Sequence, residues 1–226
     1  KMQQMLEFWQ KHADEKPEMD MLNFLKMSAD EELEFDHDDT LREMMARFHD
    51  KSQFELTPDP PKFQGKLRDY QKRGVSWIQY LEQLGLNGCL ADDMGLGKTI
   101  EVIAPLINEG ERKDSTLPTL LIAPTSVLGN WQKEMTRFAP HLTTMIHHGS
   151  SREKKEKAFQ EECAKYDMII SSYALARKDE KLFRAVEWER VVLDEAQNIK
   201  NPQTAQTKAI LKFKAKHRLA LTGTPV

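Results

Sequence analysis

Short apolar runs alternate with longer amphipathic stretches in the part of the chain that follows Leu67. The apolar runs predict strands at 88–91, 119–123, 143–147, 167–171, 190–194 and 218–222. The stretches between them predict helices at 69–84, 99–108, 127–138, 151–165, 175–186 and 204–213. This alternation is typical of a parallel sheet with helices on both faces. We therefore expect an α/β fold, in which ligands bind beyond the carboxyl ends of the strands.

Residues 1–62 differ from the rest of the chain in composition and charge. Helix-forming stretches at 2–11, 19–27 and 40–49 accompany an acidic run at 30–39. About 8 basic and 16 acidic residues precede position 63, against about 25 and 20 after it. Three prolines within 58–61 favour an extended segment, because proline lacks an N–H and restricts the residue before it. We expect an acidic helical appendage at 1–57, a proline-rich linker at 58–62 and a separate domain at 63–226.

Cysteine usage and hydropathy narrow the class of protein. Cys89 and Cys163 lie far apart and form no Cys-x-x-Cys pair, so neither a disulfide framework nor a zinc site is indicated. No apolar run approaches the roughly 18 to 20 residues of a membrane span, and the N-terminus has no signal pattern. We expect a soluble protein without a membrane partner, in a reducing compartment: cytoplasmic or nuclear, and nucleoid-associated if bacterial.

A glycine-rich segment at 92–99 follows a predicted strand and precedes a predicted helix. It reads Asp92-Asp93-Met94-Gly95-Leu96-Gly97-Lys98-Thr99. The glycines let backbone N–H groups approach phosphates, Lys98 can neutralise the β and γ oxygens, and Thr99 can offer a hydroxyl to Mg²⁺. The strict pattern has glycine where this chain has Asp92, and a turn that only caps the helix is the alternative. We predict that the segment binds ATP and Mg²⁺.

The predicted strand at 190–194 ends in two adjacent carboxylates, Asp194 and Glu195. In a nucleotide site, one carboxylate can hold Mg²⁺ through water while the other orients and deprotonates the attacking water. We assign the metal to Asp194 and the water to Glu195, and count Lys98 with them as catalytic. An Asp-Glu pair is also common on surfaces. We expect the pair to meet the 95–99 turn at neighbouring strand tips.

Together with three further motifs, these segments resemble the Swi/Snf family of remodeller-type ATPases within helicase superfamily two. The string at 92–99 is similar to that family's Asp-Glu-Met-Gly-Leu-Gly-Lys-Thr, which also lacks the first glycine. The stretches 120–131 (LLIAPTSVLGNW) and 219–225 (LALTGTP) look like two more family motifs, and 63–77 looks like the segment that holds adenine. The resemblance covers about 63–226 and implies a RecA-like N-terminal helicase lobe.

The resemblance also implies roles for single residues. Gln71 would read the adenine edge, although it could equally be an exposed helix residue. The nucleic-acid contacts, or their supports, would be Thr125, Ser126, Asn130, Trp131, Ser171 and Ser172, with Tyr173 beside them. Trp131 alone is better explained as a core anchor. Gln197, Thr222 and Thr224 would couple the nucleotide state to movement between lobes, and Gln197 stands where many relatives have histidine. Basic clusters at 152–157 and 208–218 are candidates for phosphate contacts, but they are equally typical of solvated helix faces.

The function that the resemblance implies is ATP hydrolysis coupled to translocation along double-stranded DNA, with a DNA-bound protein complex as a further partner. Arginines from a second RecA-like lobe would stabilise charge on the γ-phosphate. Since the chain begins Lys1-Met2 and ends at Val226, before such a lobe, we expect an excised fragment that is nearly inactive alone. Two alternatives stay open: an RNA-directed helicase of the same superfamily, and a non-hydrolytic scaffold that keeps a nucleotide fold.

Two local features have no assigned function. His147 and His148 are adjacent, so on a strand they point to opposite faces and make a poor pair of metal ligands. Pro105 falls within the helix predicted at 99–108, where it costs about 3 kcal/mol unless the helix kinks or ends early.

Overall fold

The computed structural model describes residues 56–83, 85–91, 97–112 and 117–223. These residues belong to a unit that spans Phe54–Val226. The expected helical appendage lies outside the described residues, apart from its last two positions. Within the described part of the chain, no helix combines the length and the apolar character that crossing a membrane requires.

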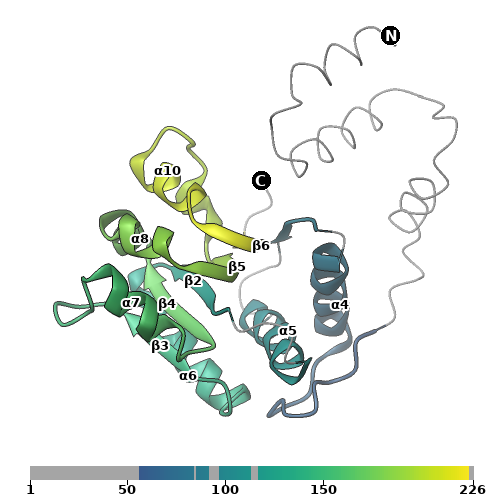
Figure 1. The fold of residues 1–226 in the computed structure, drawn as a ribbon. Coiled ribbons are helices and arrows are strands. Elements are labelled where there is room, and N and C mark those ends of the chain that lie inside the picture. Colours follow the sequence, from purple (N-terminus) through teal and green to yellow (C-terminus); the bar gives the residue numbers. More distant parts are fainter. Residues whose placement is uncertain (1–55, 84, 92–96, 113–116, 224–226) are drawn as a thin grey trace, which may run out of the picture. The chain divides into compact units, whose positions relative to one another are not determined.

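Six parallel strands of the described chain form one sheet in the order β1-β6-β5-β2-β4-β3 (Figure 1). The strands are β1 (Gly88–Ala91), β2 (Thr119–Ala123), β3 (Thr144–His147), β4 (Met168–Ser172), β5 (Glu187–Leu193) and β6 (Lys214–Thr222). The neighbouring strands β2 and β4 are buried along their whole length, as expected for strands covered on both faces. The predicted parallel sheet is confirmed, and each predicted strand is present.

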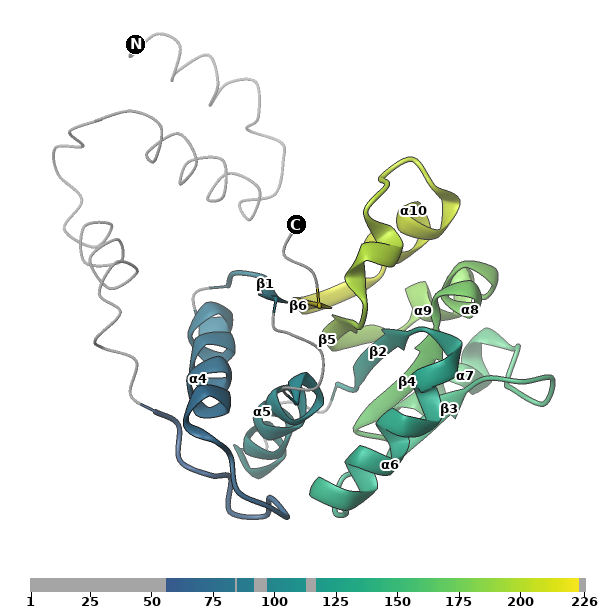
Figure 2. The same ribbon diagram turned by 180° about the vertical axis from the view of Figure 1, so that it is seen from behind.

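Helices cover both faces of the sheet (Figures 1 and 2). On one face α4 (Asp69–Gln83), α5 (Lys98–Arg112) and α6 (Leu128–Phe138) enclose a core that includes Val75, Ile103 and Trp131. On the other face lie α7 (Glu156–Cys163), α8 (Tyr173–Lys178), α9 (Glu180–Ala185) and α10 (Ala205–Leu211). Their core contains Phe159, Phe183 and Trp188. This two-faced arrangement is the α/β fold that the sequence predicts.

The bounds of three predicted helices differ most from those in the structure. The helix predicted at 175–186 is two helices, α8 and α9, which meet at Asp179. The helix predicted at 151–165 begins only at Glu156, because the Glu153 carboxylate accepts hydrogen bonds from the N–H groups of Lys154 and Lys155 and holds a turn there. The helix predicted at 99–108 starts at Lys98 and runs through the buried Pro105 to Arg112. The proline therefore does not end it early.

The proline-rich segment lies against α4. The Thr57 N–H donates to Oγ of Ser76 (2.9 Å), and the Thr57 hydroxyl donates to Oε1 of Gln79 (3.0 Å). The Asp59 carboxylate accepts from the Leu67 N–H (2.9 Å), and Pro60 is buried. These contacts fix the start of α4, the helix that carries Gln71.

Candidate active site

The predicted functional segments lie along one edge of the sheet. In a parallel sheet all carboxyl ends of the strands share an edge, and that edge is where ligands bind. The order of strands therefore sets the order of segments: Gly97–Thr99 after β1, Thr222 at the end of β6, the Asp194-Glu195 pair after β5, residues 124–131 after β2, and Ser171-Ser172 at the end of β4. One strand, β6, lies between β1, which precedes the predicted phosphate-binding segment, and β5, which precedes the two carboxylates. The expectation that these segments follow neighbouring strands is therefore wrong.

The last glycine of the segment predicted to bind phosphate is required by its backbone conformation and by a close neighbour. Gly97 has φ +89°, in the left-handed region that favours glycine. A Cβ at this position would lie 2.5 Å from Nε2 of Gln71. The Gly97 carbonyl accepts from the Ile100 N–H (2.9 Å), which begins α5 with Lys98 in its first turn. The predicted ligand residues Asp92, Asp93, Met94, Gly95 and Leu96 lie outside the described residues.

Gln71 is buried beside this turn rather than exposed on its helix. Its side chain is only 4% exposed, and its Oε1 accepts a hydrogen bond from the Arg68 N–H (2.9 Å). A second close approach joins the same two helices, because Glu101 of α5 lies directly against the Cα of Gly74 on α4. The packing of α4 on α5 therefore places an amide side chain next to Gly97, which is compatible with the adenine-reading role predicted for Gln71.

Asp194 is held in place by several hydrogen bonds. The indole Nε1 of Trp131 donates to Oδ2 of Asp194 (2.7 Å), and the Tyr173 hydroxyl donates to the Asp194 carbonyl (2.7 Å). Burial raises the pKa of the Asp194 carboxyl, while the bond from Trp131 and the positive charge of Lys98 oppose that rise.

Glu195 follows in an unusual backbone conformation. Among the non-glycine residues that the structure describes, it is the one with a positive φ, at 52°. Such conformations are costly and concentrate at functional sites. Its Oε2 accepts a hydrogen bond from Nε2 of Gln197 (2.6 Å), and Oε1 of Gln197 accepts one from the Thr222 hydroxyl (3.1 Å). Two of the three residues predicted for coupling are therefore linked to Glu195, and the third, Thr224, lies outside the described residues.

The residues predicted to serve nucleic-acid binding fall into an exposed group and a buried group. Thr125, Ser126 and Asn130 are exposed, at the start of the segment that follows β2. The buried group consists of Trp131 (3% exposed), Ser171 (0%) and Ser172 (3%). The Ser171 hydroxyl donates to the His147 carbonyl (3.1 Å), and the Ser172 hydroxyl accepts from the Leu175 N–H (3.4 Å) at the start of α8. The exposed group is open to a ligand, and the buried group makes internal contacts.

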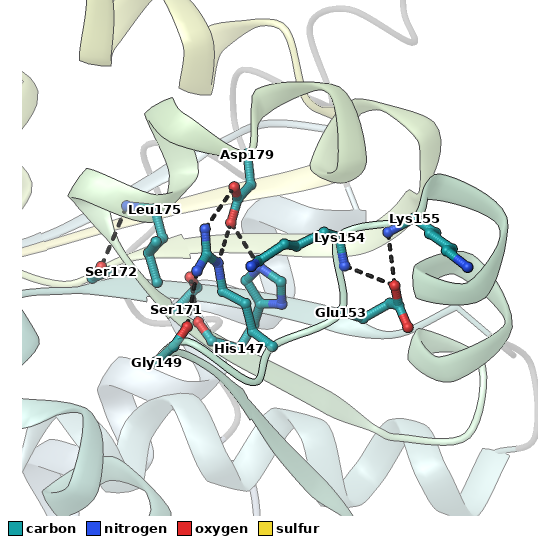
Figure 3. A network of polar contacts seen from close by, with 10 residues as sticks. His147, Gly149, Glu153, Lys154, Lys155, Ser171, Ser172, Leu175 and Asp179 are labelled. Carbon is teal, nitrogen blue, oxygen red and sulfur yellow. Dashed lines mark hydrogen bonds and ion pairs between the residues drawn. The ribbon is translucent and has the colours of Figure 1, made fainter.

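A polar network that the sequence did not reveal lies beside Ser171 (Figure 3). Asp179 accepts from Nε2 of His147 (3.0 Å) and, with both carboxylate oxygens, from Arg152 (2.6 and 3.0 Å). Burial lowers the pKa of His147, and the imidazole therefore donates in its neutral form. Burial would raise the pKa of Asp179, but the hydrogen bonds from Arg152 and His147 outweigh it and lower that pKa. The network ties the 149–155 segment to the junction of α8 and α9.

The donor atoms at the sheet edge suit a magnesium ion with a triphosphate. Mg²⁺ prefers hard oxygen ligands and keeps several waters. A carboxylate has about four lone-pair directions, so Asp194 can accept from Trp131 and still hold a metal-bound water. Thr99 lies in the first turn of α5, half-buried, with a hydroxyl of the required kind. Lys98 adds the positive charge that phosphate oxygens need, so the residues fit the predicted cofactors.

Taken with the sheet order, this site defines the RecA-like nucleotide-binding lobe of helicase-type ATPases. The family comparison is specific: residues 70–226 match the SNF2-related domain. The chain belongs to this family.

Relatives and solved structures agree with that assignment. The chain is 41% identical over 204 residues to YwqA of Bacillus subtilis, covering 90% of this chain and 22% of YwqA. It is 40% identical over 176 residues to the human chromatin-remodeling ATPase INO80, covering 75% of this chain and 11% of INO80. The Sulfolobus solfataricus SWI2/SNF2 ATPase core in complex with dsDNA is 44% identical with a TM-score of 0.68, over 76% of this chain and 35% of that one. The chain thus spans a minor part of each relative.

Proposed function

We propose that this chain is the ATP-binding lobe of a DNA-dependent ATPase that translocates along double-stranded DNA to remodel protein–DNA complexes. Family membership supports the ATPase class. The choice of duplex DNA is supported by the related Sulfolobus core, which forms a complex with dsDNA, and the remodelling role by the name of INO80. Because the chain covers only 22% of YwqA and 11% of INO80, these activities belong to the complete natural protein.

The observation that carries the proposal is the placement of Lys98 and Asp194 at the same edge of the sheet, beyond the carboxyl ends of β1 and β5. The two residues come from segments after different strands, β1 and β5, and they are the residue types that a magnesium triphosphate requires on its two sides. Lys98 would neutralise the β and γ oxygens. Asp194, fixed by Trp131, would hold the ion through water. The bound ion would supply charge neutralisation on the phosphate oxygens.

Glu195 would orient and deprotonate the attacking water. Its carboxylate is half-buried, and Gln197 donates to only one of its oxygens in the bonds described, Oε2. The hydrogen bond restricts the rotation of the carboxylate, so the other oxygen points in a defined direction. Gln71, beside Gly97, would receive the adenine edge. Thr125, Ser126 and Asn130 would contact the DNA backbone from the exposed segment after β2.

The experiment compares ATP hydrolysis by the complete natural protein with duplex DNA, with RNA and without nucleic acid. Glu195→Gln keeps the shape of the side chain and removes the base, so we expect the DNA-stimulated kcat to fall by about a hundredfold or more. Glu187→Gln is the matched control, at the exposed opposite end of β5, and should leave kcat unchanged.

Each alternative has its own outcome in this assay. Stronger stimulation by RNA than by duplex DNA would favour an RNA-directed helicase. Hydrolysis by the wild type that is no higher than in Glu195→Gln and Lys98→Ala would favour a scaffold that retains the fold without the chemistry. For the chain alone we expect nucleotide binding with little or no hydrolysis, since stabilising arginines would come from a second lobe. Rapid DNA-stimulated hydrolysis by the chain alone would refute the need for those arginines.

A further inference from the structure

Two buried aromatic residues reach Asp194 from two different strand ends. Trp131 lies on α6, in the segment after β2, and its indole N–H donates to the Asp194 carboxylate at 2.7 Å. Tyr173 begins α8, directly after β4, and its hydroxyl donates to the Asp194 carbonyl at 2.7 Å. The Glu195 carbonyl lies 3.5 Å from the same hydroxyl. Each ring therefore connects a segment expected to serve nucleic-acid binding with the carboxylate pair.

We infer that Trp131 and Tyr173 are positioning residues that transmit nucleic-acid binding to the Asp194-Glu195 pair. The inference rests on the proposed function, which supplies the identity of the ligand on the exposed side. Trp131 would determine the orientation of the Asp194 side chain, and Tyr173 would determine the position of the backbone that carries both carboxylates.

The burial of Trp131 excludes it as a surface ligand and suits it to transmission. Its side chain is 3% exposed, whereas the preceding residue, Asn130, is exposed on the same helix. A helix turn is stiff, so a shift of Asn130 towards a phosphate moves the indole with it. A hydrogen bond from an N–H to a carboxylate is strong and depends steeply on direction. A small displacement of α6 therefore changes the orientation of the Asp194 carboxylate.

Tyr173 acts on the backbone instead. Glu195 adopts φ 52°, a conformation that persists only when its surroundings hold it. The Tyr173 hydroxyl donates to the carbonyl immediately before that residue. On the other side of Tyr173, Ser172 accepts from the Leu175 N–H and Ser171 donates to the His147 carbonyl, so the start of α8 is anchored to β3 and β4. When DNA binding moves this segment, the hydrogen bond from the Tyr173 hydroxyl would transmit the movement to the turn at Asp194-Glu195.

The test removes each hydrogen bond while retaining an aromatic ring, in the complete natural protein. Tyr173→Phe deletes the hydroxyl, and Trp131→Phe deletes the indole N–H. Replacement of Trp131 by benzothienylalanine, in which sulfur takes the place of the N–H, deletes the donor without a change of shape. The matched controls are Trp188→Phe and Tyr166→Phe. Trp188 lies in the core on the face of α7 to α10, where its indole donates to the Phe183 carbonyl at 2.9 Å, and Tyr166 packs partly buried against the same core.

We expect each site variant to lower the DNA-stimulated kcat by about tenfold or more, the effect of losing one hydrogen bond to a charged or strained group. The Trp131 variants should also raise the Mg²⁺ concentration for half-maximal activity, since Asp194 loses its orientation. The Kd for duplex DNA should stay within about twofold of the wild type. The control variants should leave kcat, the Mg²⁺ requirement and DNA binding unchanged.

Three results would overturn the inference. One is wild-type DNA stimulation in both Tyr173→Phe and the benzothienylalanine variant. The second is an equal loss of kcat in Trp188→Phe, which would mean a general packing effect. The third is weaker DNA binding with unchanged saturated kcat, which would make the two rings part of the DNA contact. A wild-type protein without DNA-stimulated hydrolysis would instead refute the proposed function. The role of Trp131 in orienting Asp194 would then be tested by the Mg²⁺ dependence of ATP binding. An unchanged Mg²⁺ dependence in the benzothienylalanine variant would count against that role.

Discussion

The Thr222 hydroxyl donates a 3.1 Å hydrogen bond to Oε1 of Gln197. Thr222 ends β6, the strand that lies between β1 and β5, and Gln197 lies in the short 3₁₀ helix Ala196–Ile199 that follows the carboxylate pair. Nε2 of the same glutamine donates to Oε2 of Glu195 at 2.6 Å. The amide of Gln197 therefore bridges the end of β6 and the residue proposed to act on water.

Thr222→Val should slow ATP hydrolysis without weakening ATP binding. Valine has nearly the shape of threonine but leaves Gln197 without its hydrogen-bond donor, which costs about 1 kcal/mol and corresponds to roughly a fivefold loss of kcat. Steady-state kinetics of the complete natural protein, with a separate measurement of the Kd for ATP, would check this. Thr119→Val is a control of equal burial at the other end of the sheet. Unchanged kcat in Thr222→Val would remove Thr222 from the coupling path.

Gly97→Ala should abolish tight nucleotide binding. The substitution introduces a Cβ 2.5 Å from Nε2 of Gln71 and forces alanine into φ +89°. The backbone conformation alone costs about 1–2 kcal/mol. Displacement of Gln71 should add a larger loss, so we expect the Kd for ATP to rise more than tenfold.

Gly149→Ala separates these two contributions. Gly149 also has a positive φ, +81°, but a Cβ there meets no heavy atom within 4 Å. It should lower the free energy of unfolding by about 1–2 kcal/mol and leave the Kd for ATP unchanged. Isothermal titration calorimetry and urea unfolding would provide both quantities. Equal losses of ATP affinity in the two variants would show that contact with Gln71 has no part in the effect.

Local sequence patterns were sufficient for most of the fold. The predicted strand at 119–123 coincides with β2, because a strand buried in a parallel sheet is a continuous apolar run with polar flanks. The predicted strand at 88–91 coincides with the edge strand β1, of which only Leu90 is buried. The sequence pattern did not predict the break between α8 and α9, because neither glycine nor proline stands there. Asp179 stands at that break, and its partners His147 and Arg152 are 32 and 27 residues away along the chain. A local pattern contains no information about such partners.

The candidate site was predictable where its chemistry is local. The turn at Gly97–Thr99 and the Asp194-Glu195 pair are short strings with recognisable chemistry. The bond from Trp131 to Asp194 joins residues 63 positions apart, and burial of the indole depends on how α6 packs on the sheet. The sequence alone favoured a core anchor for Trp131, and the structure adds the polar contact of its ring nitrogen.

The His147–Asp179 pair should make stability depend on pH. Burial lowers the pKa of His147 below its usual 6.5, so the unfolded chain takes up a proton at a higher pH than the folded chain does. Stability from this residue is therefore lost as the pH falls from about 6.5 through the lower folded pKa, with a slope of at most about 1.4 kcal/mol per pH unit. The lowered pKa of Asp179 adds a second loss below its usual 3.8, as the pH falls through its folded pKa.

His147→Gln should remove the loss of stability that begins as the pH falls below about 6.5. Urea unfolding of the chain at several pH values between 7 and 5 should show a shallower dependence than the wild type. His148→Gln is the matched control, because the neighbouring imidazole is exposed and makes no part of the network in Figure 3. If the two variants have the same pH dependence as the wild type, the acid sensitivity of the fold originates elsewhere.

The ion pair between Glu82 and Arg190 should be the most sensitive polar contact for stability. Arg190 on β5 is 1% exposed and donates through Nε to Oε1 of Glu82 (2.5 Å) and through Nη2 to Oε2 (2.6 Å). The pair links α4 to β5 across 108 positions of the chain. Glu82→Gln removes the carboxylate that both described hydrogen bonds of this buried guanidinium reach, which should lower the free energy of unfolding by about 3 kcal/mol.

Two further variants distinguish a lost charge pair from a lost packing contact. Glu180→Gln removes the partner of the exposed Lys212 and Arg184 and should change stability by less than about 1 kcal/mol. Glu82→Leu combined with Arg190→Met replaces both charges by apolar side chains of similar volume, and should recover most of what Glu82→Gln loses. If the double variant is less stable than Glu82→Gln, the two hydrogen bonds contribute more to stability than the desolvation of the two charges costs.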